Sequence, residues 1–223
     1  MQFRHELKHE INTADMLVLR QRLRAVMTPD PHAINGVYEI RSLYFDNADD
    51  KALREKLDGV NVREKYRIRL YNGDTSMIRL ERKFKVNSLG EKESARLTAE
   101  QAQAIVDGDI DWMAQSGSEV IVGLYSRMRS QGLRPKTIVD YTREPFISGP
   151  GNVRVTLDYT LRTGLGRTDF LSPSCVTIPA PEAPGILEVK GDAFLPDVIR
   201  SAVQLEGRHS AAFSKYAACR MYD

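Results

Sequence analysis

Bulky apolar residues alternate with charged residues along several segments of the chain, which is the period expected of strands with one buried face. This alternation covers residues 3–11, 37–46, 62–72, 76–86, 136–148, 152–163 and 185–191. The segments 62–72 and 76–86 flank Asn72-Gly73-Asp74, a sequence typical of a hairpin turn. The pattern predicts about seven or eight strands, most of them in hairpins.

Helices are predicted between these strands, at residues 14–27, 46–59, 99–107, 119–131, 196–206 and 210–221. Pro29 and Pro31 end the first of them. Thr98 and Gln101 have the spacing of a capping box at the start of the third. The Pro- and Ser-containing residues 164–184 predict a loop. Together the elements indicate the α+β class, built on a large antiparallel sheet or barrel.

Composition supports a single domain over residues 1–223 with enough apolar residues, 42%, for a core. The net charge of +2 does not indicate a non-specific nucleic-acid binder, so any cationic site must be local. Cys175 and Cys219 are too few for a disulfide framework, which favours reduced thiols in a cytoplasm. No apolar run reaches membrane-spanning length and the N-terminus is too charged for a signal peptide, although a membrane partner stays open.

One face of the predicted strands is dense in long charged side chains. The segment REKYRIRLYN places Arg63, Lys65, Arg67 and Arg69 at every second position, opposite bulky residues. The other strands add Arg4, Glu6, Lys8, Arg79, Glu81, Lys83, Lys85, Arg154, Asp158, Arg162, Glu188 and Lys190. Like charges on neighbouring strands are destabilising, so this face needs an explanation.

Two explanations fit the pattern. An antiparallel sheet often has one face packed on helices and the other solvated, and that arrangement alone produces the alternation. Against it, a solvated face usually mixes Thr, Ser, Gln and Asn with its charges, whereas these positions are almost purely Arg, Lys and Glu. Arg and Lys suit phosphate oxygens, and the few carboxylates suit Mg²⁺ or Mn²⁺. The second explanation is therefore a site for a polyanion and its metal.

Eight short motifs, in order, resemble a known family: RHELK, RSLYFDN, REKYRIRLYN, LERKFK, VDYTRE, VRVTLD, LEVK and SAAFSKY. They are similar to the VTC-type polyphosphate polymerase domain, in its short bacterial form, of the triphosphate tunnel metalloenzyme superfamily. The resemblance runs from residue 3 to about residue 222. It implies an eight-stranded antiparallel tunnel with a charged interior and helices outside.

The resemblance also implies roles for individual residues. Phosphate-binding positions fall on Lys8, Arg67, Arg69, Lys83, Arg143, Arg154, Lys190 and Lys215, with Lys85 and Lys92 as further candidates. Glu188 falls on the metal position, and Glu6, Glu81 and Asp158 are further metal candidates. The catalytic set implied is Lys8, Arg67, Arg69, Lys83 and Glu188.

The activity implied is metal-dependent transfer of the γ-phosphoryl group of ATP onto a growing polyphosphate chain, with Mn²⁺ or Mg²⁺ as cofactor. Water as acceptor would give a tripolyphosphatase or nucleoside triphosphatase instead. A third possibility is a non-catalytic module that binds polyphosphate or a nucleotide within a membrane assembly. Arg4 stands where the wider superfamily has the first Glu of ExExK, which argues against a thiamine triphosphatase or a CYTH-type cyclase.

Overall fold

The computed structural model describes residues 5–86, 89–180, 185–192, 194–208, 210 and 212–221. The chain divides into two compact units. The first unit comprises Met1–Glu39, Tyr141–Leu161 and Pro181–Ser214, and the second Ile40–Asp140, Arg162–Ala180 and Lys215–Asp223. The expected single domain over residues 1–223 stays a prediction.

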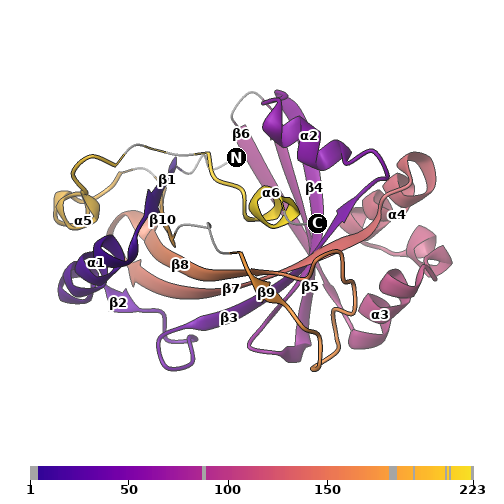
Figure 1. Ribbon diagram of the computed structural model, residues 1–223, viewed down its shortest axis with the longest axis horizontal. Helices are drawn as coiled ribbons and strands as arrows, with labels where there is room; N and C mark the ends of the chain where they lie inside the picture. Colours follow the sequence, from indigo (N-terminus) through magenta and orange to yellow (C-terminus); the bar gives the residue numbers. More distant parts are fainter. Residues whose placement is uncertain are drawn as a thin grey trace. The chain divides into compact units, whose positions relative to one another are not determined.

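The first unit is an antiparallel half-sheet backed by two helices. Its strand order is β1 (His5–Ile11), β10 (Gly185–Gly191), β8 (Val153–Thr163) and β7 (Arg134–Ser148), with the short β2 (Thr28–Pro29) beside β7. Helices α1 (Thr13–Val26) and α5 (Asp197–Val203) pack against each other (Figure 1). Asn12 and Asp15 form a capping box that fixes the start of α1.

The core of the first unit lies on one face of this half-sheet. Leu19 and Leu23 of α1 and Ile199 of α5 pack on Val155 and Leu187, which belong to neighbouring strands. These positions are the apolar half of the alternation seen in the sequence. The other half of the same strands therefore forms a separate, charged face.

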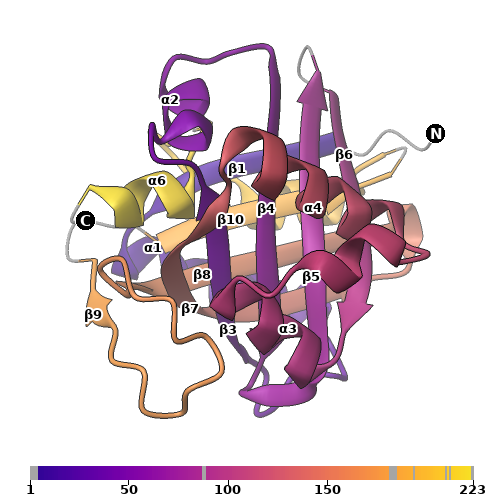
Figure 2. The same cartoon turned by 90° about the vertical axis from the view of Figure 1, so that its right-hand side faces the viewer.

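The second unit contains the strands β3 (Tyr38–Asp46), β4 (Val62–Tyr71), β5 (Asp74–Val86) and β6 (Leu89–Leu97), in that order. Helices α3 (Ala99–Asp107) and α4 (Glu119–Gln131) cover one face of these strands, with the 3-10 turn η1 (Asp111–Gln115) between them (Figure 2). Tyr66, Ile68 and Leu80 lie in the core beneath the helices. The helices α2 (Lys51–Leu57) and α6 (Lys215–Arg220) pack on each other.

The expected hairpin is confirmed: β4 and β5 pair antiparallel, and Asn72 and Gly73 both have positive φ, 52° and 69°. This is the conformation that a two-residue hairpin turn requires and that Asn and Gly adopt most readily. Thr98 and Gln101 form the expected capping box at the start of α3.

Some expectations differ from the structure. The helix expected over 210–221 covers only Lys215–Arg220, because Ser210 forms a β-bridge with His9 and 212–214 are not helical. Strand β6 was not predicted, because Glu91 and Glu93 interrupt the apolar positions of its alternation. The expected loop over 164–184 includes β9 (Ile178–Pro179), while residues 181–184 lie outside the described part.

The strands together form an antiparallel sheet of ten strands with the order β1-β10-β8-β7-β3-β4-β5-β6, with β2 beside β7 and β9 beside β8. Over the described residues this order has two ends, so the α+β class with a large antiparallel sheet is confirmed but the closed eight-stranded barrel is not. Within the part of the chain that the structure covers, none of the helices has the length and apolar character needed to cross a membrane.

Candidate functional site

The β4–β6 charged face lies opposite the helix-covered face of the second unit. The ladder register aligns Lys65, Lys83 and Lys92 across the three strands, and Arg69 with Arg79 in another row. Side chains directly opposite one another on antiparallel strands share a face and lie close together. The face therefore presents rows of like charge, as the alternation predicted. Its members are Arg63, Lys65, Arg67, Arg69, Arg79, Glu81, Lys83, Lys85, Lys92 and Arg96.

Part of this face is buried rather than solvated. Arg69 is only 3% exposed and Glu81 only 2%, although Arg79 and Lys83 on the same face are exposed. An ordinary solvated sheet face would leave Arg and Glu in water, because burying a charge is costly. The simple solvated-face explanation therefore fails at Arg69 and Glu81.

Glu81 is a counter-ion within the cationic rows. Its Oε2 atom accepts from Arg67 Nε at 2.7 Å, and its Oε1 atom forms an ion pair with Lys92. Burial alone would raise the pKa of Glu81, but Arg67, Arg69 and Lys92 outweigh burial and hold that pKa well below its usual range. Both carboxylate oxygens thus contact cations in this structure, and the metal role expected for Glu81 stays a prediction.

Two tyrosines to which the sequence assigned no binding role contact residues of this face. Tyr44 of β3 stands opposite Arg67 in the ladder, and its hydroxyl accepts from Arg67 Nη1 at 2.9 Å. Tyr216 of α6 stacks on Tyr44 with ring centroids 5.0 Å apart. Lys65 Nζ lies 5.5 Å from the centroid of the Tyr216 ring. Helix α6 is thereby anchored beside Arg67, and Lys215, expected to bind phosphate, is its first residue.

The electrostatic environment of Tyr44 shows how positive this region is. Burial alone would raise the pKa of the Tyr44 phenol, but Arg67, Arg69 and Lys65 lower it overall. A set of positive charges strong enough to reverse a burial effect will also favour an incoming anion. The planar Arg forks match the geometry of both carboxylate and phosphate groups.

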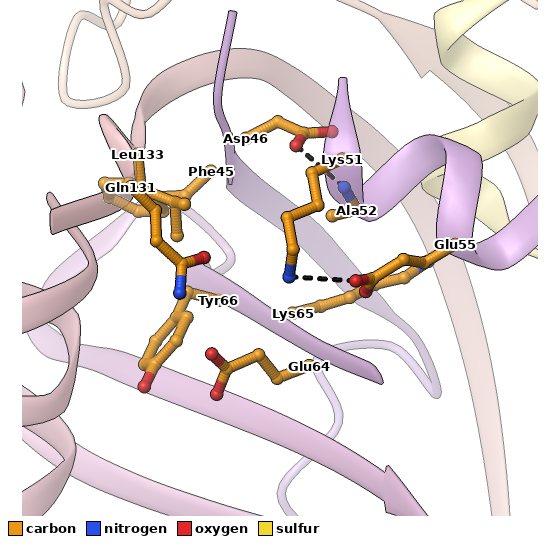
Figure 3. Close-up of a pocket in the computed structure, with 10 residues that line it drawn as sticks. All are labelled: Phe45, Asp46, Lys51, Ala52, Glu55, Glu64, Lys65, Tyr66, Gln131 and Leu133. Atoms are coloured by element: carbon orange, nitrogen blue, oxygen red, sulfur yellow. Dashed lines mark hydrogen bonds and ion pairs between the residues drawn. The ribbon is translucent and has the colours of Figure 1, made fainter. Parts of the chain in front are cut away.

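A small pocket on the second unit, between α2 and β4, does not share this character (Figure 3). Lys51 Nζ pairs with Glu55 at 2.8 Å, and Asp46 accepts from the backbone nitrogen of Ala52 (Figure 3). Glu64, also on the wall, is bound by Arg82 and Arg127. Its three carboxylates outnumber its two lysines, so this pocket does not suit a polyanion.

Lys65 should make the stability of the protein depend on pH. Burial lowers the pKa of its ammonium group from 10.5 to about 8, so the unfolded chain binds more protons than the folded chain between these values. The free energy of unfolding should therefore rise as pH increases through this window, by up to about 3 kcal/mol. Denaturant unfolding at pH 7, 8, 9 and 10 measures the change.

The comparison variants isolate Lys65 from other titrating groups. In Lys65→Met the free energy of unfolding should no longer rise with pH. Lys85 lies on the same face, two ladder rows from Glu81. Lys85→Met leaves Lys65 in place, so the rise should be retained in that variant. A rise of equal size in Lys65→Met and in the wild type would assign the effect to other groups.

The first unit carries a second charged cluster, centred on Glu188 of β10. Its Oε1 atom lies 3.1 Å from Lys190 Nζ and 3.5 Å from Lys8 Nζ, and its Oε2 atom accepts from Arg143 Nη2 at 3.3 Å. Arg143 also makes a bidentate pair with Asp158, with both distances 2.7 Å. Glu188 is 6% exposed and Asp158 1%, so these charges are desolvated.

Arg143 connects the two carboxylates of this cluster. Burial alone would lower the pKa of its guanidinium, but Asp158 in particular raises that pKa well above its usual value, so Arg143 stays charged. Arg154 lies on the same face, opposite Lys190 in the ladder, and pairs with Asp30 at 3.1 Å. The backbone of Glu6 pairs with Lys190, but the Glu6 side chain lies outside the described part of the structure.

The donor chemistry of this cluster fits a divalent cation of the Mg²⁺ type. Among the described residues no group of three or more His, Cys, Asp or Glu side chains is placed to hold a metal by itself. Mg²⁺, however, is commonly bound by one or two carboxylates with the rest of its shell from water and substrate phosphates. Glu188 and Asp158 provide two buried carboxylates joined through Arg143. These carboxylates would bind such an ion in place of the Lys and Arg side chains that contact them in this structure.

The structure places the candidates predicted from the sequence in two groups. Lys8, Arg143, Arg154, Asp158, Glu188 and Lys190 gather in the first unit, and Arg67, Arg69, Glu81, Lys83, Lys85, Lys92 and Lys215 belong to the second. Sequence reasoning gave no role to Lys65, Tyr44 or Tyr216. The alternation in REKYRIRLYN already placed Lys65 on the charged face, but no pattern indicates how deeply it is buried.

Comparison with known proteins identifies one family. The model of the VTC domain matches residues 3–222 of the chain. No curated protein matches the chain. Among solved structures, the PH1819 protein of Pyrococcus horikoshii is 14% identical, covers 90% of this chain and 84% of its own, and has a TM-score of 0.45. A protein from Bacillus halodurans provisionally named an adenylate cyclase is 12% identical, with coverages of 86% and 80% and a TM-score of 0.49.

Proposed function

The chain belongs to the VTC domain family, and from this premise we propose that it is a metal-dependent polyphosphate polymerase that transfers the γ-phosphoryl group of ATP onto a polyphosphate chain. The family indicates a polyphosphate- or triphosphate-related function in general terms. The specific reaction, the acceptor and the metal, Mn²⁺ or Mg²⁺, are part of the proposal. The closed tunnel, lined by the charged strand faces, is also part of the proposal.

The observation that carries the proposal is the burial of charge in the Glu188 cluster. Three cationic side chains, Lys8, Arg143 and Lys190, contact buried Glu188, and Arg143 is shared with the second buried carboxylate, Asp158, so these three cations face two carboxylates. Two buried carboxylates need compensation, but two well-placed cations would provide it, so one positive charge is left over. The excess of positive charge suits a polyanion, and the carboxylate itself suits the metal that accompanies phosphates. A protein that only binds anions has no need of this carboxylate.

Each group of residues has a distinct part in the proposed reaction. Arg67 and Arg69 offer planar forks that bind phosphate oxygens, while Lys8 and Lys190 turn from Glu188 to the substrate when it binds. A divalent cation on Glu188 and Asp158 supplies neutralisation of the phosphate oxygens when bound. Catalysis of phosphoryl transfer rests mainly on such positioning and charge stabilisation, so no Ser or Cys nucleophile is required.

In the proposed transfer, a terminal oxygen of the polyphosphate chain attacks the γ-phosphorus of ATP. The bond from that phosphorus to the bridging oxygen breaks, ADP leaves with the electron pair, and the chain grows by one unit. The same arrangement with water as nucleophile would release phosphate. Localisation in the cytoplasm, with a membrane-protein partner holding the domain at the inner face of the membrane, also remains part of the proposal.

Incubation of the purified protein with ATP and Mn²⁺ tests the reaction directly. We expect ADP and polyphosphate as products when both are resolved, and no turnover in excess EDTA, because the carboxylates act through a divalent ion. ADP with orthophosphate alone would identify a hydrolase, and no product at all a binding module. Full turnover in EDTA would contradict the metal dependence.

A further inference from the structure

Thr156 of β8 has an unusual position in the Glu188 cluster. In the ladder register it stands directly opposite Glu188, which in turn stands opposite Lys8, so the three side chains share one face. Thr156 is only 3% exposed. Its Oγ1 atom is buried and has no hydrogen-bond partner among the residues that the structure describes.

The other buried Ser and Thr hydroxyls of the described residues have partners. Ser42 accepts from Arg69, Thr137 from the backbone nitrogen of Gly166, and Thr163 from that of Leu165. Thr177 accepts from Arg162. Buried polar groups in proteins are hydrogen-bonded in the large majority of cases, and an exception calls for a strain, a ligand or a water to explain it. Thr156 is such an exception, and it lies within the charged cluster.

The surroundings of Thr156 indicate the charge of the missing partner. Its opposite residue, Glu188, is an acceptor, but the carboxylate oxygens already contact Lys8, Lys190 and Arg143. Those same three cations would attract an anion to this place. A hydroxyl donates a stronger hydrogen bond to an ionised oxygen than to a neutral one. A phosphate oxygen therefore satisfies both the cations and the hydroxyl.

We propose that the Thr156 hydroxyl is a substrate-binding group that donates a hydrogen bond to a phosphate oxygen held by Lys8, Lys190 and Arg143. The proposal rests on the proposed function, since it takes the ligand to be a triphosphate or polyphosphate. Thr156 lies between the main-chain positions of Arg154 and Asp158 on the same face. It adds a neutral, directional donor to a set of cations that bind by charge.

The proposal makes stability and binding respond in opposite directions to one substitution. Thr156→Val keeps the shape of the side chain and removes the unpaired hydroxyl, so the unfolding temperature of the free protein should stay the same or rise. Binding of tripolyphosphate should weaken about ten- to hundredfold, which is the effect of losing a hydrogen bond to a charged group. If Thr156 had only a structural role, Thr156→Val would lower both the unfolding temperature and the affinity for tripolyphosphate, or would change neither.

Calorimetric titration with tripolyphosphate in EDTA provides the test, with Thr156→Ser as the matched control. Thr156→Ser keeps the hydroxyl and should bind within about threefold of the wild type, which is less than half of the free energy expected for a lost charged hydrogen bond. The titration is done without metal to distinguish two roles of the hydroxyl. If Thr156→Val loses affinity for tripolyphosphate only when Mn²⁺ is added, the hydroxyl is a metal ligand, and the proposed contact with phosphate is wrong.

The remaining outcomes separate this inference from the proposed function. Wild-type affinity in Thr156→Val would overturn the inference alone, and would mean that a resident water satisfies the hydroxyl. Failure of the wild type to bind tripolyphosphate would overturn both. Weakened binding in Thr156→Val together with a lowered unfolding temperature, and neither change in Thr156→Ser, would assign a packing role and also overturn the inference.

Discussion

Replacing Glu188 with glutamine is expected to abolish turnover while leaving polyphosphate binding in place. The amide preserves the shape of the side chain but removes the negative charge that a divalent cation requires. It also releases Lys8, Arg143 and Lys190 from their shared counter-ion, so the empty site becomes more positive. We therefore expect turnover to fall by at least about 100-fold, more than is usual for residues that merely support a metal ligand, and binding without metal to tighten.

Glu144→Gln is the matched control for this variant. Glu144 is also a buried carboxylate of the first unit, but it is held by Arg20 and Arg24 of α1. Its substitution should lower the unfolding temperature without changing turnover or binding. Titration of labelled polyphosphate beside a turnover assay measures both variants. Wild-type turnover in Glu188→Gln would show that the metal assignment is wrong.

Replacing Arg67 with alanine is expected to weaken binding and turnover together. The guanidinium is fixed by Glu81 and by the Tyr44 hydroxyl, so its position is set before any ligand arrives. A hydrogen bond to a charged group contributes about 1.5–3 kcal/mol, which corresponds to about a ten- to hundredfold loss of affinity. Unlike Glu188, Arg67 acts by binding the polyphosphate chain. At low substrate concentration, turnover should therefore fall by the same factor as the affinity.

Arg82→Ala provides the control for Arg67→Ala. Arg82 lies on β5 directly opposite Tyr66, one of the core residues beneath the helices, and pairs with Glu64 and Glu93. Both variants remove a guanidinium from a carboxylate and should cost stability, but only Arg67→Ala should affect polyphosphate binding. Equal affinities in Arg67→Ala, Arg82→Ala and the wild type would mean that the β4–β6 charged face does not contact the substrate.

The fold was largely predictable because alternation and capping are local properties of the sequence. The period of two in REKYRIRLYN placed Arg63, Lys65, Arg67 and Arg69 on one face of β4, as the ladder register has them, and Asn72-Gly73 marked its turn. Strand β6 was not predicted, and the reason is physical. As a strand at the end of the sheet order it needs few apolar residues, and Leu89, Ala95 and Leu97, with Glu91 and Glu93 between them, do not establish a period.

The sequence named residues that the structure brings together, but it did not indicate their partners, and their roles in binding and catalysis stay predictions. The motif resemblance selected Lys8, Arg143 and Glu188 from segments far apart in the chain, and the structure brings these side chains together. Which cation meets which carboxylate depends on strand register, which alternation alone does not specify. Burial of Lys65 and the unpaired Thr156 hydroxyl likewise depend on packing from other elements, and no local pattern indicates them.

Titration of the wild-type protein with tripolyphosphate, beside orthophosphate, tests the central claim that the charged strand faces bind a phosphate chain. A chain contacts several cationic groups at once, whereas orthophosphate reaches few of them. We expect saturable binding of tripolyphosphate at one site, at least about 100-fold tighter than orthophosphate, which equals the contribution of one or two further charged hydrogen bonds. Equal affinities for the two anions, or no measurable binding of tripolyphosphate, would contradict the account.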